Sequence, residues 1–288
     1  MNTALELDAV DRLDARQFLI AIKRLADSLM YGADASAAVG PGIEYAQSRP
    51  YEPGDAVRSI DWRVTARTRR VHVKEYEAPK QMAAYLLLDT SASMTISSTR
   101  TSKYARAVQI AGGVALACLQ NLHPVALVGT GQRTLNYAPS MSRNRILQWL
   151  HELRTFHLDE QTTLAYQCSA LGPKLVHRSL IIVLSDLNER AALTPLKSLA
   201  QKHDCVALQF RDPAEDGLPH AGFIRGQEAE TGRGFVTRGT QLGIDQRLVE
   251  AELKRARVDH LVIPTHLPFE HRLRYFFKSR GLLGRGAR

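Results

Sequence analysis

The sequence has few cysteines and no long apolar segment, and both absences narrow the class of protein. Cys118, Cys168 and Cys205 are far apart and form no C-x-x-C pair, so we expect buried apolar side chains in a reducing compartment. No apolar run approaches the roughly 20 residues that a transmembrane helix needs. The N-terminus, MNTALELDAVDRLDA, lacks a basic region followed by an apolar core. We therefore expect no secretory signal and a cytoplasmic location.

Signatures of several enzyme classes are also missing. The chain has no G-x-S-x-G elbow and no G-x-x-x-x-G-K-[ST] loop. Its ten histidines are scattered, and His151 and His157 are expected to be ordinary surface side chains. A two-metal nuclease would need a denser cluster of carboxylates than this sequence offers.

The chain is basic, with a net charge of +9 and a sequence pI of about 9.6. This balance raises the possibility of a nucleic-acid or anionic-lipid partner. However, the basic residues are dispersed, and no aromatic residues alternate with them as on a base-stacking platform. The densest groups are Arg67, Arg69 and Arg70, and then the C-terminal Lys278, Arg280, Arg285 and Arg288. A generally basic surface is the favoured interpretation, and nucleic acid is not the expected partner.

The 288 residues are 44% hydrophobic, which is enough to bury a sizeable core. From residue 83 onward, short and almost wholly apolar segments alternate with segments of helical periodicity. The expected strands are 83–89, 124–131, 179–186, 205–211 and 260–264, and the expected helices are 103–121, 143–154, 164–175, 193–202 and 244–257. This alternation predicts an α/β fold with a mostly parallel sheet and helices on both faces.

The remaining segments complete the predicted organisation. An amphipathic helix at residues 9–31 is followed by a loop at 32–42 and an irregular segment at 43–80 with a strand at 70–77. A Gly- and Pro-rich stretch at about 212–240 predicts a hairpin insertion with its turn at 230–233. We expect three parts. They are an N-terminal helix and irregular or β segment (1–80), the sheet domain (81–265), and a C-terminal amphipathic helix and tail (266–288).

The most informative segment follows the first buried strand and reads Leu88-Asp89-Thr90-Ser91-Ala92-Ser93-Met94. Its carboxylate and two hydroxyls at alternate positions can converge in a tight loop, and α/β sheets bind ligands beyond the carboxyl ends of their strands. The strand at 179–186 also ends in an aspartate, Asp186, so two negative charges should meet there and repel unless a cation lies between them. Oxygen ligands with few carboxylates suit Mg²⁺. The structural alternative is a set of turn and cap residues.

The segment LLLDTSASM resembles the metal-ion-dependent adhesion site (MIDAS) of von Willebrand factor A domains. The resemblance implies a von Willebrand A-like, Rossmann-type fold with one divalent cation, Mg²⁺ or another such as Mn²⁺ or Ca²⁺. The implied ligands are Asp89, Ser91, Ser93, Thr162 and Asp186, the last acting through water. The family usually has glycine just before the threonine, whereas this chain has Glu160-Gln161, so the backbone at Thr162 departs from the pattern.

A second segment, RPYEPGDAVRSIDW (49–62) followed by Ala66-Arg67, resembles the signature of the bacterial domain-of-unknown-function 58 family. The resemblance extends through the metal motif to DPAEDGLP and ETGRG, over roughly residues 40–265. It implies a von Willebrand A-like domain whose relatives are often encoded beside MoxR-type AAA+ ATPases.

The signature segment has two possible roles. Pro53-Gly54 is a turn pair that Asp55 can close, and Arg58 has Asp55 and Asp61 within local reach. We expect Trp62 to pack against the sheet domain, which would make the segment a structural clasp. The other interpretation is a docking surface for a partner.

Together these features predict a non-enzymatic, divalent-cation-dependent protein-binding module. The expected partner is a MoxR-type AAA+ ATPase that offers an acidic residue to the cation. One alternative is a Mg²⁺-dependent hydrolase of phosphate esters, although haloacid-dehalogenase phosphatases need D-x-D, and Ser91 stands at the second position here. Another is a nucleic-acid-associated basic protein, which steep salt dependence of binding would reveal.

Overall fold

A computed structural model describes residues 5–6, 15–30, 44–77, 82–133, 135–156, 160–216, 223–227, 230, 233–238 and 246–280. The chain divides into two compact units, one made of residues 1–31 and 82–288 and the other of residues 32–81. The predicted N-terminal part, residues 1–80, is therefore divided. Its helix belongs to the sheet unit, and residues 32–81 form the smaller unit. The predicted tail at the C-terminus lies outside the described residues.

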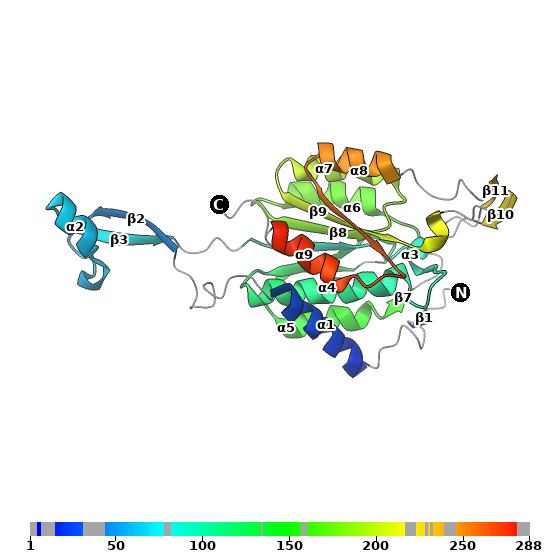
Figure 1. Ribbon diagram of the computed structural model, residues 1–288, viewed down its shortest axis with the longest axis horizontal. Coiled ribbons are helices and arrows are strands. Elements are labelled where there is room, and N and C mark those ends of the chain that lie inside the picture. Colours follow the sequence, from blue (N-terminus) through cyan, green and yellow to red (C-terminus); the bar gives the residue numbers. More distant parts are fainter. Residues whose placement is uncertain are drawn as a thin grey trace. The chain divides into compact units, whose positions relative to one another are not determined.

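The larger unit is built on a six-stranded sheet (Figure 1). Its strands in chain order are β4 (Ala84–Leu88), β5 (Val125–Gly129), β6 (Asn136–Ser140), β8 (Leu180–Ser185), β9 (Asp204–Arg211) and β12 (Asp259–Pro264). They lie side by side in the order β12-β9-β8-β4-β5-β6, and β6 runs antiparallel to β5 while the other neighbours are parallel. The predicted α/β class with a mostly parallel sheet is confirmed, and β6 is the strand that the apolar pattern did not predict.

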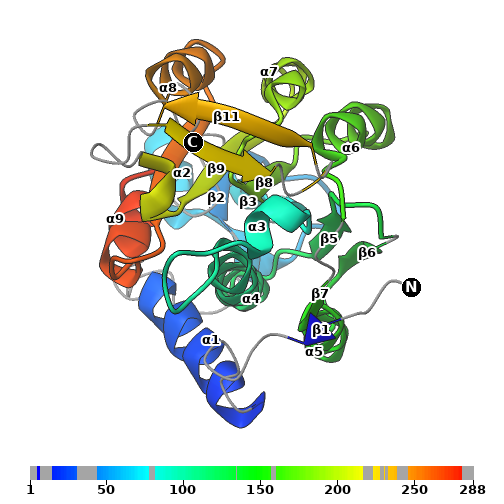
Figure 2. The ribbon, with the colours of Figure 1, turned by 90° about the vertical axis from the view of Figure 1, so that its right-hand side faces the viewer.

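Helices cover both faces of this sheet (Figure 2). One face carries α1 (Ala15–Met30), α4 (Lys103–Gln120), α5 (Arg143–Glu152) and α9 (Glu270–Arg280), and the other carries α6 (Leu164–Leu171), α7 (Leu193–Ala200) and α8 (Gln246–Arg255). Alternate residues of one strand enter different cores: Leu86 and Leu88 join the first, and Leu87 joins the second. The continuous apolar runs of the sequence therefore reflect burial on both faces.

The N-terminal helix α1 packs closely on α4. Its apolar face, which the sequence predicts, enters the same core as α4. Two glycines of α4 make the approach possible: a Cβ on Gly112 would lie 2.7 Å from Cδ1 of Ile22, and one on Gly113 would lie 2.6 Å from Cδ2 of Leu25. The helix axes can come this close because neither glycine carries a side chain.

Smaller elements surround the sheet. A two-residue pairing joins β1 (Leu5–Glu6) to β7 (Thr155–Phe156), and an antiparallel hairpin joins β10 (Phe223–Gln227) to β11 (Gly234–Arg238). This hairpin confirms the predicted insertion. At the end of α9, Arg280 donates to Asp204 and Asp259 at 2.8 and 2.9 Å, which fastens the C-terminal helix to the two outer parallel strands.

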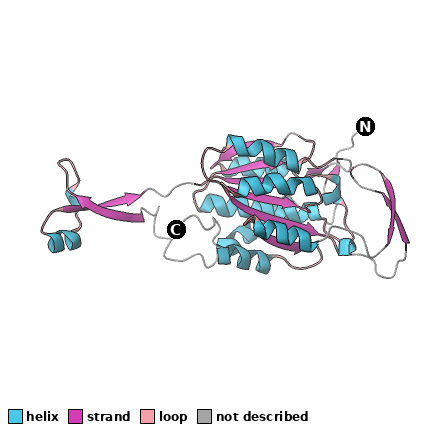
Figure 3. Cartoon of the chain, turned by 90° about the horizontal axis from the view of Figure 1, so that it is seen from above, coloured by secondary structure: helices cyan, strands magenta, loops and turns pink. Residues whose placement is uncertain are grey.

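The smaller unit is an antiparallel pair of strands, β2 (Glu44–Pro50) and β3 (His72–Glu77), joined through the helix α2 (Trp62–Thr68) (Figure 3). The sequence predicts β3 but leaves β2 and α2 in an irregular segment. Helix α2 forms because Asp61 caps it, accepting hydrogen bonds from the backbone N–H groups of Arg63 and Val64.

The structure also shows the environment of the cysteines and the apolar character of the helices. Cys118, Cys168 and Cys205 are free and buried, as expected of small apolar side chains, and burial raises the pKa of each thiol to about 12. In the described part of the chain, no helix has the length and apolar character needed to cross a bilayer.

Candidate cation site at the carboxyl edge of the sheet

The strand order places the candidate site at a reversal of the chain. After β4 the chain adds β5 and β6 on one side, and it later returns to add β8 on the other. The carboxyl ends of β4 and β8 are therefore neighbours, and the N–H of Asp89 donates to the carbonyl of Leu184 at 2.9 Å. This is the topological switch point at which doubly wound sheets bind ligands.

Four of the five predicted residues converge at this point. The backbone N–H of Ser91 donates to Oδ1 of Asp89 at 3.1 Å, and the hydroxyls of Ser91 and Ser93 lie 3.1 Å apart. The hydroxyl of Ser93 then donates to Oδ2 of Asp186 at 2.9 Å. Ser91 precedes the short helix α3 (Ala92–Thr95), which turns the loop back over the strand ends (Figure 2). The convergence expected from the alternating spacing is present.

Thr162 lies at the same edge but is not joined to this chain of hydrogen bonds. Its loop is held by the N–H of Ala92, which donates to the carbonyl of Glu160 at 2.7 Å. Its backbone N–H donates to Glu230 at 3.3 Å, and its hydroxyl accepts from the N–H of Leu164 at 3.4 Å. Among the described residues, no hydrogen bond links the Thr162 hydroxyl to Asp89, Ser91 or Ser93.

A buried ion pair, which we call the brace, holds the start of the Thr162 loop. The Glu160 side chain is 3% exposed and accepts from the backbone N–H of Arg133 at 2.6 Å and from its Nε at 3.0 Å. Gly131 packs against Glu160 and the Thr90 hydroxyl so closely that a Cβ there would overlap both side chains. The brace therefore orders Glu160, while the exposed Gln161 occupies the position directly before Thr162.

A buried lysine, which the sequence did not predict, lies in this site. The Nζ of Lys103 donates to Oδ2 of Asp186 at 2.8 Å and also pairs with the carboxylate of Glu215, and the lysine side chain is 2% exposed. Burial by itself would lower the pKa of Lys103, but the charges of Asp186 and Glu215 outweigh it and raise the pKa above its usual value. The position of Lys103 in the sequence could have indicated this pair. A lysine in the first turn of a helix interacts unfavourably with the helix dipole, so a buried one needs a carboxylate partner.

The DPAED part of the family signature holds this lysine in place. Asp212 accepts hydrogen bonds from the hydroxyl of Ser97 at 3.0 Å, from the backbone N–H of Ser98 at 2.8 Å and from the Ser98 hydroxyl. These bonds tie the loop before α4 to the end of β9, while Glu215 reaches Lys103. The DPAED segment therefore lines one side of the site through Asp212 and Glu215.

Asp186 and Asp89 differ in how far their charges are compensated. The carboxylate of Asp186 accepts from Ser93, Lys103 and both the backbone and side-chain nitrogens of Asn188. Asp89 accepts from the hydroxyl of Ser185 at 2.5 Å and from the N–H of Ser91, both of them uncharged donors. Among the described residues, no cationic side chain forms a salt bridge with Asp89.

These donors fit a divalent cation. Within the described residues no three His, Cys, Asp or Glu side chains are grouped as for a metal site, so a cation here would depend on hydroxyls as well as carboxylates. Asp89, Ser91 and Ser93 would hold it directly, and the saturated Asp186 would act through water. Oxygen donors with so little charge match Mg²⁺, which keeps several of its waters.

Asp89 is expected to destabilise the fold when no cation is present. Burial and the neighbouring Asp186 carboxylate raise the pKa of Asp89 to about 7. Because the folded chain holds this proton more tightly than the unfolded chain, whose pKa is about 4, the free energy of unfolding should fall as the pH rises from about 4 to about 7. Denaturant titrations in chelator should show this fall, and Asp89→Asn should flatten it. An equal slope in both chains would contradict the assignment.

The signature segment of the smaller unit pairs differently from the prediction. Asp55 closes its turn by accepting from the N–H of Glu52, but its ion-pair partner is Arg49, at 2.7 and 2.8 Å, rather than Arg58. This bidentate pair lowers the pKa of Asp55 below its usual value. Asp61 is occupied by the cap of α2.

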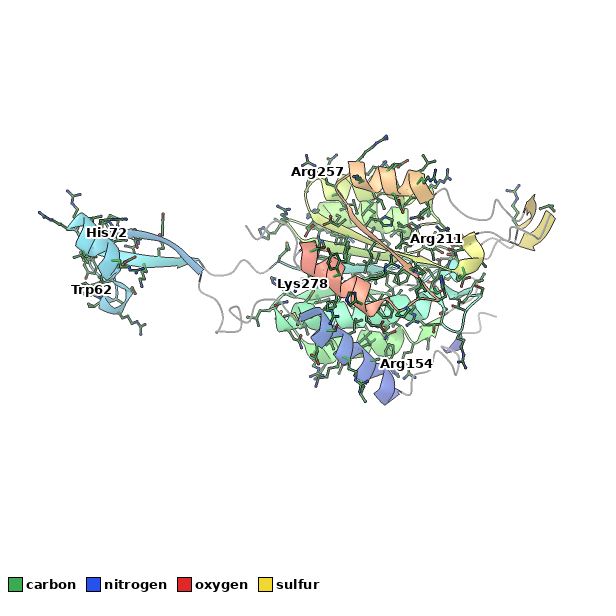
Figure 4. All side chains as sticks on the ribbon, viewed as in Figure 1. Trp62, His72, Arg154, Arg211, Arg257 and Lys278 are labelled. Atoms are coloured by element: carbon green, nitrogen blue, oxygen red, sulfur yellow. The ribbon has the colours of Figure 1, made fainter. Side chains whose placement is uncertain are left out.

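The residues of the smaller unit leave the Trp62 side chain 68% exposed (Figure 4), and packing of this side chain against the sheet domain stays a prediction. Residue 62 is the first residue of α2, and Asp61 fixes the start of that helix.

Trp62→Ala is expected to change the free energy of unfolding by no more than about 0.5 kcal/mol, because an exposed ring leaves no cavity. A buried ring would instead cost about 3–5 kcal/mol. Denaturant melts of the two chains measure the difference, and a loss in the larger range would show that Trp62 is covered.

The fold and the site define a doubly wound α/β domain with an oxygen-rich cluster at its switch point, combined with a small β unit. The chain belongs to the family described as "Protein of unknown function DUF58", whose model matches residues 47–258. It is similar to the uncharacterized proteins Mb1516 of Mycobacterium bovis and Rv1480 of Mycobacterium tuberculosis. Each is 29% identical over 224 residues, covering 75% of this chain and 70% of the relative.

Among solved structures, the chain is similar to the crystal structure of the SpRpn10 VWA domain. The TM-score is 0.44 with 12% sequence identity, over 72% of this chain and 98% of that domain. The family predicted from the signature segment is confirmed by the family match.

Proposed function

We propose that this chain is a non-enzymatic protein-binding module that recognises its partner through a divalent cation. The observation that carries the proposal is the convergence of Asp89, Ser91, Ser93 and Asp186 at the switch point of the sheet. The donors are oxygen atoms of two carboxylates and two hydroxyls, which are the ligands that Mg²⁺, Mn²⁺ and Ca²⁺ prefer.

The coordination around the site favours an acidic ligand from outside. Lys103 pairs with both Asp186 and Glu215, so Asp89 is the one carboxylate of the proposed site that would contact a divalent cation directly. An incoming carboxylate would supply a further charged oxygen and complete the coordination. The net charge of +9 on the chain would add steering toward an acidic partner.

The partner that we propose is a MoxR-type AAA+ ATPase, which presents a Glu or Asp to the cation. This choice follows from the family resemblance, because relatives are often encoded beside such ATPases. A catalytic role is not proposed: a phosphatase of the haloacid-dehalogenase kind needs a second carboxylate two residues after Asp89, and Ser91 occupies that position.

Binding to the purified ATPase should require both the cation and Asp89. In a surface-based binding assay, we expect chelator or Asp89→Ala to weaken binding by about a hundredfold or more, since the bridging ion is then lost. Lys278→Ala, on the exposed side of α9, is the control and should bind like the unmodified chain. Equal binding with and without divalent cation would overturn the proposal. Turnover of a phosphate ester that is lost in Asp89→Asn would favour the hydrolase instead.

A further inference from the structure

The smaller unit exposes apolar side chains around a tryptophan that is held in place. Asp61 fixes the first residue of α2 through the N–H groups of Arg63 and Val64, at 3.0 and 3.2 Å, and Ser48 donates to the other carboxylate oxygen at 2.7 Å. Trp62 therefore has a fixed backbone while its side chain is 68% exposed (Figure 4). Fixing the backbone lowers the entropy that the residue would lose on binding.

Trp62 lines a shallow depression together with the buried carboxylate of Asp61 and five further residues. The apolar ones are Ile60, Trp62 and Val64, and the basic ones are Arg63, Arg67 and Lys74. We call this set the Trp62 surface. Its composition, an aromatic anchor beside arginines, matches the residues that contribute most to protein interfaces.

Among the described residues that line the depression, three side chains are basic and one, Asp61, is acidic. Among the described residues, Arg63, Arg67 and Lys74 form no salt bridge. The nearby carboxylates are engaged elsewhere: Asp55 pairs with Arg49, Glu75 accepts from Gln47, and Asp61 caps α2. The surface thus combines positive charge with an apolar floor, which is complementary to a ligand that carries both negative charge and an apolar side chain.

We propose that the Trp62 surface binds an acidic protein segment that inserts an apolar side chain between Trp62 and Val64. A nucleic acid is less well matched, because sequence-independent strand binding uses a series of stacked aromatic rings rather than one. A membrane is less well matched, because interfacial binding uses a long amphipathic helix, whereas α2 has seven residues. This contact needs no cation, and its residues all belong to the smaller unit.

The fluorescence of Trp62 provides a direct test on the full chain. The sequence has two tryptophans, and Trp149 is 1% exposed, so added acrylamide should quench Trp62 selectively. The probe is a synthetic peptide of about twelve residues, made of Glu and Asp with one central Leu, titrated in chelator with Trp62→Phe as the blank. We expect a saturable blue shift with a dissociation constant below about 1 mM. The same peptide with Ser for Leu should bind several-fold more weakly.

Matched variants locate the site. Arg63→Ala combined with Arg67→Ala should weaken peptide binding about tenfold or more. The double variant Arg255→Ala/Arg257→Ala removes two exposed arginines of the sheet unit and should have no effect. Three results would overturn the proposal. They are no saturation, a Trp62 ring already shielded from acrylamide in the free chain, or tighter binding of a single-stranded oligonucleotide or anionic vesicles than of the peptide.

Discussion

Lys103→Ala is expected to lower the free energy of unfolding by about 3–5 kcal/mol, because it leaves a buried carboxylate without its counter-charge. Lys103 and Asp186 each have side chains that are 2% exposed, and their charged atoms are 2.8 Å apart. Water cannot readily replace the ammonium at such a depth. The loss should therefore far exceed the value of an ordinary surface pair.

Denaturant melts in chelator measure this effect, and a surface pair supplies the control. Lys197 and Glu252 are 2.6 Å apart but are 37% and 40% exposed, so Lys197→Ala should change stability little. Adding Asp186→Asn to Lys103→Ala should restore part of the loss, since it removes the stranded charge. Excess Mg²⁺ should also restore part of it through binding to the folded state. A loss no greater than that of Lys197→Ala would contradict the assigned pair.

Gly131→Ala is expected to cost about 2–3 kcal/mol through overpacking in the brace that holds the Thr162 loop. Its Cβ would overlap the Thr90 hydroxyl and the carboxylate of Glu160. Glu160 would have to move away from Arg133, whose N–H and Nε it accepts. Because the Glu160 carbonyl also anchors Ala92, the displacement should reach α3 and the serines of the site.

Gly234→Ala is the matched control, because in the described part of the chain no atom beyond its two sequence neighbours lies within 4 Å of the position that its Cβ would occupy. Thermal or denaturant melts should leave this variant close to the unmodified chain. Divalent-cation binding should weaken in Gly131→Ala and stay unchanged in Gly234→Ala. Similar stability of the two variants would show that the Thr162 loop tolerates displacement.

The sheet could be predicted where burial leaves a pattern in the sequence. Segments such as residues 180–184 are apolar at every position because helices cover both faces, and β8 is buried throughout. Strand β6 left no such pattern, since its residues are exposed or half-buried and it is held by backbone pairing to β5. The placement of α1 could not be predicted either, because an apolar helix face does not identify the helix that covers it.

The site was predictable where it depends on strand ends and not where it depends on contacts between distant segments. Asp89 and Asp186 follow adjacent parallel strands, so the fold class alone brings them together. The partners of Lys103 are 83 and 112 residues away in sequence, and only the folded loops after β8 and β9 bring them to it. Helix α2 was not predicted, because the cap at Asp61 that places Trp62 at its first position is a local hydrogen-bonding feature and leaves no periodic pattern.

Titrating the isolated chain with Mn²⁺ shows directly whether Asp89 and its neighbouring hydroxyls hold a divalent cation. Electron paramagnetic resonance counts the free ion and so gives both stoichiometry and affinity. We predict one ion bound per chain, with affinity reduced about tenfold or more in Asp89→Ala and unchanged in Lys278→Ala. Binding that is the same in Asp89→Ala, or no binding up to about 10 mM Mn²⁺, would show that these residues do not hold a divalent cation.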